Sequence, residues 1–421
     1  MTTSVDTLGP PPTTVGVLGW LRKNLFSTWY NTLLTIVSLW LIYTVVSQLL
    51  VWAFTTARWG VITANLRLFM VGPFPPDQVW RVWIVLGIVS VMMGLSAGVF
   101  GGTMRTFGVW LGAAYATLIV LDLIAEQTRP FADFARRFDE GGAGQFWIAL
   151  PGMVWLAANL AMLALGWLIG RGRAKWRARL ILAWLGSFFV TVALLQGYGK
   201  DTWLPEIGTN LWGGLLLTFM LSVVSIVVSF PLGVLLALGR RSKLPAVKIF
   251  SVLYIELVRG VPLVTILYMT QIMLPLFLPG ELRIDNVLRA MAGMTVFTAA
   301  YMAENVRGGL QAIPTGQIEA AHAVGLSDAL TTLLIVLPQA LRMVIPAIVG
   351  LFISLFKDTT LATIVALLEL LGVGRSVLAQ PEFLGLQTEV YIFVAAIFFV
   401  FSYMMSFASY RVEEALGVGK R

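Results

Sequence analysis

The sequence predicts an all-α protein that crosses a membrane about ten times. Of its 421 residues, 58% are hydrophobic and only 12% are charged, and the mean hydropathy is +0.86. A soluble domain of ordinary composition carries about 25% charged residues. An apolar helix needs about 20 residues to cross the hydrocarbon core. Runs of that kind lie near residues 28–56, 82–102, 107–125, 147–170, 178–197, 211–238, 249–278, 288–308, 332–356 and 390–411.

The first 27 residues precede these runs. Residues 1–18 are rich in Pro, Thr and Gly and lack the basic-then-apolar layout of a cleavable signal peptide. Arg22 and Lys23 then come just before the first long apolar run. We therefore expect residues 1–27 to form a disordered cytoplasmic tail.

The second and third apolar runs are separated only by residues 103–106. Arg105 lies in this separator and must sit at an interface, because a charge in the bilayer centre is costly. Residues 82–125 are thus either two spans or one re-entrant pair.

Basic loops orient the chain. Residues 170–179 and 239–248 each carry several Lys and Arg and no acid, which is typical of cytoplasmic loops. With ten spans, both termini are then cytoplasmic, and the mixed-charge loops 197–210 and 278–287 lie outside. A third loop, with Arg129, Arg136 and Arg137, would also lie outside, in the company of four acids. The net charge of +8 is therefore a topology signal, so the expected partner is the lipid bilayer and not nucleic acid.

Residues 313–346 are polar inside an apolar half of the chain. Thr315 can cap a helix, residues 317–324 read as about two helical turns, and Gly325 stands where a left-handed stop belongs. Ser327 and Asp328 then open a second helix. Two short helices joined by a glycine elbow predict a docking element for another protein.

This stretch resembles a known signature. Glu319, Ala320 and Ala321, then Gly325, then Leu337-Pro338 are similar to the EAA loop of the membrane subunits of bacterial ABC importers. The resemblance implies that residues 313–330 form a coupling loop that seats in a cleft of a cytoplasmic ATPase. An ordinary amphipathic surface helix is the alternative reading.

The resemblance extends over the C-terminal half, to the five-span core of type I importer permeases and within them to the polar amino acid family. It implies an additional group of helices at 28–200 and an importer core at 201–421, as in the larger permeases of general L-amino-acid uptake systems. The segments that carry it are 211–218, 236–240, Glu256 with 258–263, 301–304 with 307–309, and 356–361.

Four consecutive polar residues, Lys357, Asp358, Thr359 and Thr360, directly follow the ninth run and are called the polar quartet below. Lys357 lies roughly 22 Å along a straight helix from Arg342, at about 1.5 Å per residue. If Arg342 marks the cytoplasmic interface, the quartet falls within the hydrocarbon core, which is about 30 Å thick. We expect a helix break that lines the substrate pathway and holds the charged ends of an amino acid. A Lys357–Asp358 pair that only braces the fold is equally compatible with the sequence.

Two further pairs of opposite charge lie near the cytoplasmic ends of the seventh and eighth runs. Glu256 and Arg259, and likewise Glu304 and Arg307, are three residues apart and share a helix face. Each pair can shape a gate or anchor a helix at the interface.

The sequence contains few residue patterns suited to catalysis or metal binding. It has no nucleotide-binding G-x-x-x-x-G-K-[ST] loop and no G-x-S-x-G elbow. It has no Cys and only one His, His322, which favours helix packing or docking over metal binding. We expect no catalytic residue, no metal site and no cofactor on this chain, with ATP and Mg bound by a partner ATPase.

Together these features predict the permease subunit of an ATP-driven ABC importer for L-amino acids in the bacterial inner membrane. The resemblance implies a second homologous permease, two ATPase copies and a periplasmic amino-acid-binding protein as partners. A self-sufficient secondary transporter or channel for small polar solutes is the alternative, but it needs no docking loop. A membrane-embedded enzyme fails for want of catalytic groups.

Overall fold

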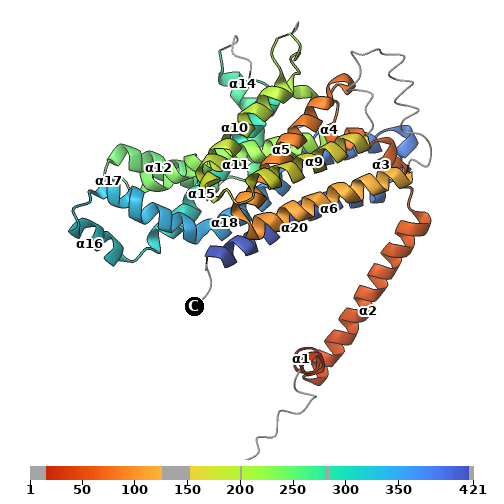
Figure 1. Ribbon diagram of the computed structural model, residues 1–421, viewed down its shortest axis with the longest axis horizontal. Coiled ribbons are helices and arrows are strands. Elements are labelled where there is room, and N and C mark those ends of the chain that lie inside the picture. The colour runs from red at the N-terminus through yellow and green to blue at the C-terminus, as the bar shows by residue number, and fades with distance from the viewer. Residues whose placement is uncertain (1–15, 126–151, 200–201, 280–283, 417–421) are drawn as a thin grey trace, which may run out of the picture. The chain divides into compact units, whose positions relative to one another are not determined.

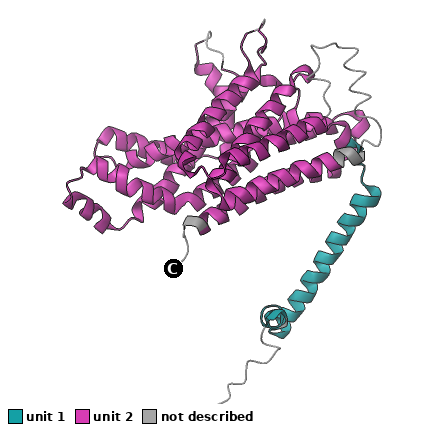
Figure 2. Ribbon diagram, in the orientation of Figure 1, with its two compact units in different colours: residues 1–61 teal, residues 62–421 magenta. Residues whose placement is uncertain are grey.

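The computed structural model describes residues 16–125, 152–199, 202–279 and 284–416, and the regular elements in these ranges are helices (Figure 1). The chain divides into two compact units, residues 1–61 and residues 62–421 (Figure 2). The boundary between them lies well before residue 200, so the part of the predicted N-terminal addition from residue 62 onward belongs to the same unit as the importer core, whereas its first helix belongs to the other unit.

The first unit holds helices α1 (Gly16–Asn24) and α2 (Trp29–Val51) and the π-helical turn η1 (Trp52–Thr56). Thr28 caps α2, since its hydroxyl accepts a hydrogen bond from the backbone N–H of Asn31 at 3.3 Å. Residues 1–15 of the expected tail lie outside the described residues. Residues 16–24 are helical, contrary to our prediction of disorder, because apolar Val17, Trp20 and Leu21 precede a basic last turn that favours a helix C-terminus.

The second unit begins with short helical segments and continues with four long helices. The short ones include α3 (Gly60–Ala64), α4 (Leu66–Val71) and η2 (Pro76–Gln78). The long ones are α5 (Trp80–Phe100), α6 (Gly102–Ala125), α9 (Gly152–Gly170) and α10 (Arg177–Gln196), with the single turn η4 (Ala174–Trp176) before α10. Residues 82–125 therefore form two helices, and the break falls at Gly101, where φ is +64°. The loop with Arg129, Arg136 and Arg137 lies outside the described residues.

Helices α5 and α9 pack closely through glycines that are four residues apart on each helix. A Cβ atom built on Gly94 would lie 2.1 Å from the carbonyl oxygen of Leu163, and one built on Gly166 would lie 2.5 Å from that of Val91. Small residues at this spacing let helix backbones approach each other inside a membrane. The pair α5–α9 is thus fixed by steric fit at Gly94, Gly98, Gly166 and Gly170.

Gly94→Leu is expected to separate α5 from α9. The new side chain would have to occupy the space of a backbone carbonyl, and overpacking of this kind costs about 1–3 kcal/mol or more. Thermal unfolding of the detergent-solubilised protein measures the loss. Gly186→Leu on α10 is the control, because a Cβ there meets nothing within 4 Å. Equal stability of both variants would contradict the close packing.

The remaining helices form the core of the C-terminal half. They are η5 (Thr209–Leu211), α11 (Gly214–Arg240), α12 (Pro245–Arg259), α13 (Leu263–Tyr268), η6 (Met269–Met273), α14 (Leu274–Phe277), α15 (Asn286–Gln311), α16 (Thr315–Ala323), α17 (Asp328–Leu330), η7 (Thr331–Val336), α18 (Leu337–Asp358), η8 (Thr359–Val365), α19 (Leu370–Leu378), η9 (Pro381–Phe383) and α20 (Gln387–Leu416). The core helices α11, α15 and α18 contact one another, and α20 packs on α18.

One predicted span is not straight. The apolar run 249–278 is bent by 106° between α12 and α13. Pro262 lies at this bend and has no N–H to continue the helical ladder, and Gly260 ends α12. The run is apolar enough overall to read as one span despite Glu256 and Arg259, so its mean hydropathy conceals the corner.

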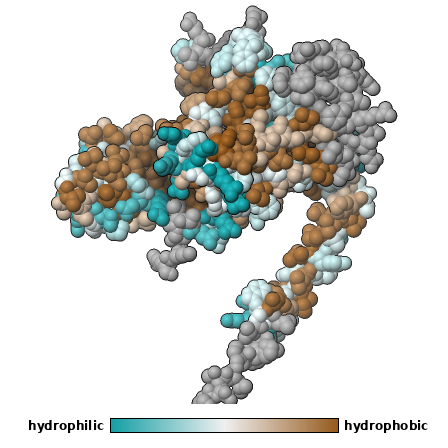
Figure 3. Space-filling model, in the orientation of Figure 1, coloured by the Kyte–Doolittle hydropathy of each residue, from teal (hydrophilic) through white to brown (hydrophobic). Residues whose placement is uncertain are grey.

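The helix count supports the predicted membrane fold. Seven described helices are long and apolar enough to cross a membrane, and the bent pair α12–α13 makes an eighth. Helices α6 and α15 coincide with the other two predicted runs. In Figure 3 hydrophobic residues cover much of the visible helical surface, and hydrophilic ones gather near the centre of the view and around α16.

The principal core lies around α11. Leu217 and Leu221 of α11 are buried with Met294 of α15 and Leu355 of α18. Phe74, from the stretch between α4 and η2, is fully buried in the same core. The segment before α5 therefore completes the core of the C-terminal half, which the sequence did not indicate.

Candidate functional site

The coupling loop, residues 313–330, is a short helix, a left-handed elbow and a second helix start. Helix α16 ends at Ala323, and Gly325 adopts φ +84°. The backbone N–H of Leu326 donates to the carbonyl of Ala321 at 3.1 Å, and that of Gly325 donates to His322 at 2.9 Å. Ser327 caps α17 by accepting from the N–H of Leu330 at 3.4 Å. The predicted glycine elbow and second helix start are confirmed.

Fewer of the predicted coupling residues are exposed on the outer face of α16 than the sequence suggested. Glu319 and Ala320 are exposed, whereas Ala321 is only 5% exposed and so cannot be part of an outer docking face. Ile318 packs into the cluster that contains Val336, which turns this side of α16 inward. Thr315 is not the cap either, because the helix starts one residue earlier, after Pro314.

An ion pair ties the second half of the coupling loop to the loop after α11. The Lys243 ammonium lies 2.6 Å from a carboxylate oxygen of Asp328, and Nε2 of His322 lies 3.5 Å from the other oxygen. The hydrogen bond to Asp328 raises the pKa of Lys243 above its ordinary value. Lys243 and His322 thus share the carboxylate of Asp328.

The polar quartet marks a real change in the helix. Helix α18 ends at Asp358, and a 3₁₀ segment, η8, begins at Thr359. The Thr359 hydroxyl donates to the carbonyl of Phe356 at 2.6 Å, and that of Thr360 donates to Lys357 at 2.8 Å. Both threonines thus bond to the last turn of α18 and stabilise the change from α to 3₁₀ geometry.

The four quartet side chains do not share one environment. Lys357 is exposed, Asp358 and Thr360 are half-buried, and Thr359 is fully buried. None of the ion pairs in the described part of the chain joins Lys357 to Asp358. The two charges are therefore available to other partners, while Thr359 does not reach an open surface.

Near the predicted cytoplasmic ends of α11, α12 and α15, five charged residues form what we call the charge network. Arg240 lies 2.9 Å from Glu256 and 3.6 Å from Glu304, and Arg259 lies 3.6 Å from the same Glu304. Arg307 donates to Glu304 through Nε at 2.8 Å, and its Nη1 donates to Gln311 at 2.8 Å.

The charge network differs from the predicted pairs in one respect. Glu304 and Arg307 do pair, as their spacing predicted. Glu256 and Arg259 share a helix but turn to different partners, because Arg240 of α11 approaches Glu256 and Glu304 of α15 approaches Arg259. Contacts between helices thus determine the partners of Glu256 and Arg259, although their three-residue spacing on one helix predicted that they would pair with each other.

Glu304→Gln is expected to destabilise the protein by about 1–3 kcal/mol, because Glu304 is the shared carboxylate of three arginines and its side chain is only 20% exposed. Glu256→Gln is the control: its side chain is 56% exposed and, among the described residues, forms an ion pair only with Arg240, so the loss should stay below about 1 kcal/mol. Thermal unfolding of the solubilised protein compares the two. A larger loss for Glu256→Gln would show that Glu304 is not the centre of the network.

A buried acid that the sequence reasoning passed over is Glu369. It is 0% exposed and caps α19, accepting from the N–H of Leu371 at 2.9 Å and of Gly372 at 2.8 Å. The hydroxyl of Thr363, in η8, also donates to it. Charge inside a membrane helix bundle is expensive. The same rule that drew attention to the polar quartet therefore applies to Glu369.

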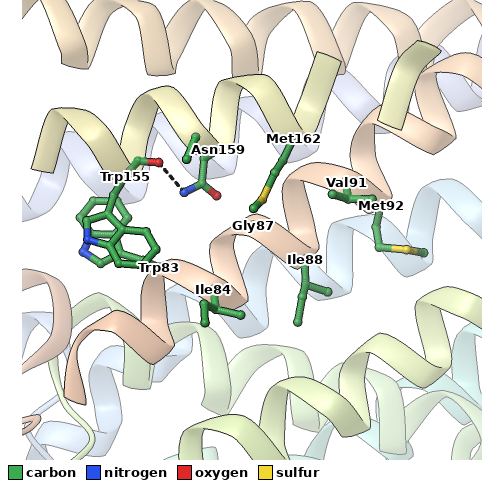
Figure 4. A pocket seen from close by; sticks show the side chains of 10 residues that line it. Trp83, Ile84, Gly87, Ile88, Val91, Met92, Trp155, Asn159 and Met162 are labelled. Carbon is green, nitrogen blue, oxygen red and sulfur yellow. Dashed lines mark hydrogen bonds between the residues drawn. The ribbon is translucent and has the colours of Figure 1, made fainter. Parts of the chain in front are cut away.

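An apolar cavity of about 310 Å³ lies between α5 and α9 (Figure 4). Trp83 and Trp155 stack at one side of it with ring centroids 6.1 Å apart. Asn159, a polar residue of its lining, already forms hydrogen bonds within the protein. Its amide N–H donates to the carbonyl of Trp155 at 2.8 Å, and its oxygen accepts from Ser90 at 3.4 Å. An amino acid carries two charges that need polar partners. This cavity does not suit such a substrate.

Comparison with known proteins gives a consistent picture. Residues 229–417 match the family model "binding-protein-dependent transport system inner membrane component". The chain is 36% identical over 418 residues, 95% of this chain and 93% of the relative, to the inner membrane amino-acid ABC transporter permease protein YhdY of Escherichia coli strain K12.

Two further comparisons cover different lengths of the chain. The chain is 36% identical, over 96% of its length and 95% of the relative, to the glutamate/glutamine/aspartate/asparagine transport system permease protein BztC of Rhodobacter capsulatus. Among solved structures, an amino acid ABC transporter crystallised with histidines is 27% identical, with a TM-score of 0.44, over 48% of this chain and 92% of that one.

Proposed function

Because the chain belongs to the family of inner membrane components of binding-protein-dependent transport systems, we propose that it is the permease subunit of an importer for L-amino acids. Membership makes it a multi-pass inner membrane protein and a transport subunit, with ATP hydrolysis left to a partner ATPase. The names of the two full-length relatives support amino acids as the cargo, with glutamate, glutamine, aspartate and asparagine as the first candidates.

The observation that carries this function is the exposed helix–elbow–helix of the coupling loop. Helix α16 offers Glu319 and Ala320 outward while Ala321 and Ile318 hold it to the bundle. A transporter driven by an ion gradient needs no such docking element. Family membership and this geometry together favour an ATP-driven importer over the alternative, a self-sufficient transporter or channel.

The partners follow from this role. ATP and Mg bind to two copies of a cytoplasmic ATPase, a second homologous permease completes the membrane part, and a periplasmic binding protein delivers the amino acid. On this chain the coupling residues are Glu319, Ala320 and Gly325, with Ala321 as their internal support.

Within this importer, the polar quartet contributes to the substrate pathway. Lys357 is exposed and has no ion pair within the described residues, so its ammonium can meet an α-carboxylate. Asp358, at the end of α18, can meet an α-ammonium. The charge network lies on a different set of helix ends, so we assign it to gating between α11, α12 and α15 and not to substrate contact.

Uptake by the reconstituted complex tests the function. Purified permeases, ATPase and binding protein in proteoliposomes are supplied with ATP inside and labelled glutamate or glutamine outside. ATP-dependent accumulation is the expected result. Accumulation without ATPase or binding protein, driven by an ion gradient alone, would instead support a self-sufficient transporter.

We further propose that both termini and the coupling loop are cytoplasmic. Cysteine substitution in this cysteine-free chain tests this orientation. Ala174 lies in the exposed basic loop between α9 and α10, and Trp203, which is 81% exposed, lies in the loop after α10. A cysteine at Trp203 should react with an impermeant maleimide added outside intact cells, and one at Ala174 should not. The opposite pattern would invert the topology.

A further inference from the structure

We propose that Glu369 is a positioning residue for transport: its buried carboxylate holds segment η8, and with it the polar quartet, in place against α11. This inference rests on the proposed function, since the quartet's role in substrate passage is part of it. Glu369 itself does not touch the substrate, because it is 0% exposed.

Both oxygens of the Glu369 carboxylate are in use. Oε2 accepts from the backbone N–H of Leu371 at 2.9 Å, and Oε1 accepts from that of Gly372 at 2.8 Å. The Thr363 hydroxyl donates to Oε1 as well. All three groups donate, so the site is matched to a carboxyl group, whose two oxygens can both accept, and not to an amide, whose NH₂ group would face a backbone N–H.

The ends of the turn around Glu369 are tied to α11. The N–H of Gly214, the first residue of α11, donates to the carbonyl of Leu368 at 2.8 Å, and the N–H of Leu370 donates to the hydroxyl of Thr218 at 3.2 Å. Residues 214 and 369 form an isolated parallel bridge. The approach is close: a Cβ on Gly213 would lie 3.0 Å from the carbonyl oxygen of Leu368. Glu369 thus sits at a fixed junction between distant parts of the sequence.

The other side of the junction leads to the polar quartet. Thr363 lies in η8, the 3₁₀ segment that begins with Thr359. After η8 the chain turns at Ala366, whose φ of +62° is unfavourable for a residue with a side chain. Such a turn persists only when surrounding contacts hold it. The Thr363–Glu369 hydrogen bond spans this turn and closes it.

Removing the carboxylate should therefore loosen η8 without emptying the core. Ala362 and Leu367 stay buried in the apolar core around α11, which keeps the bundle assembled. The quartet would lose its fixed geometry, however. A substrate contact misplaced by about 1 Å can cost about a hundredfold in rate.

Glu369→Gln tests the proposal in the complete reconstituted importer. The measured quantity is amino acid imported per ATP hydrolysed, which does not depend on how much complex survives. We expect this ratio to fall about tenfold, with ATP hydrolysis changed less than about threefold. Glu382→Gln is the matched control, because Glu382 is an exposed acid in η9. Glu369→Asp, which keeps a capping carboxylate, should restore part of the ratio.

A second measurement needs no substrate. Hydrogen–deuterium exchange on the solubilised complex should show faster exchange in peptides covering 359–372 for Glu369→Gln, with peptides from α15 unchanged. Faster exchange with an unchanged ratio would mean that Glu369 only stabilises the fold, and it would overturn the positioning role. Unchanged exchange would overturn the junction itself. Failure of the wild-type complex to import amino acids would count against the proposed function alone, since the exchange result stands without it.

Discussion

Gly325→Val is expected to reduce uptake at least tenfold while the protein still inserts into the membrane. Gly325 has φ +84°, a conformation that is strongly unfavourable for a β-branched residue, and left-handed geometry costs about 1–2 kcal/mol even for an ordinary side chain. Nothing lies within 4 Å of a Cβ at this position, so the penalty is in the backbone and not in packing. The chain is expected to relieve this backbone strain by changing the conformation of the elbow, and this change would move α16 out of its docking orientation.

Gly316→Val supplies the control for this change. Gly316 lies in α16, the helix that precedes the elbow, a Cβ there also meets nothing within 4 Å, and its φ is an ordinary helical one. Uptake and co-purification of the ATPase should fall for Gly325→Val and remain near normal for Gly316→Val. Normal ATPase co-purification and uptake with Gly325→Val would show that the elbow does not orient the docking surface.

The membrane helices were predictable because bilayer thickness imposes a length on each of them. Ten apolar runs in the sequence coincide with ten helices or bent helix pairs of the structure. The corner at Pro262 escaped notice because the hydropathy of a whole span does not distinguish a straight helix from a bent one.

The coupling loop was predictable for a different reason. Its elbow depends on local backbone chemistry, and Gly325 followed by Ser327 encodes a left-handed stop and a helix cap within three residues. The burial of Ala321 was not predictable from that pattern, because it arises from packing of α16 against the segment that begins at Thr331.

The least predictable features are those made by distant residues. Arg240 was read as a marker of a cytoplasmic loop, and its pairing with Glu256 and Glu304 needs three helices to meet. Glu369 depends on Thr218, which precedes it by about 150 residues, through the neighbouring N–H of Leu370. Its sequence signal was nonetheless present, as a lone acid between the apolar residues 361–368 and 370–371.

The double substitution Lys357→Met with Asp358→Asn should insert and assemble, yet lower uptake by at least tenfold. In the described structure no ion pair joins the two residues, so neither single change strands a buried partner, and both singles should also fold. If each charge binds one end of the substrate, losing a charged hydrogen bond costs about 1.5–3 kcal/mol, which is roughly a factor of 10 to 100.

The double mutant then decides between the two readings of the quartet. Charges that only brace each other would give two unstable singles and a recovered double, whereas charges that bind substrate give two stable, poorly active singles whose defects do not cancel. Lys248→Met with Glu382→Gln removes the same charges from exposed positions outside the quartet and should transport normally. Near-normal uptake by the quartet double mutant, alongside poor expression of both singles, would show that Lys357 and Asp358 are structural. Because Thr359 is fully buried, the substrate contact would then pass to Thr360 or to the partner permease.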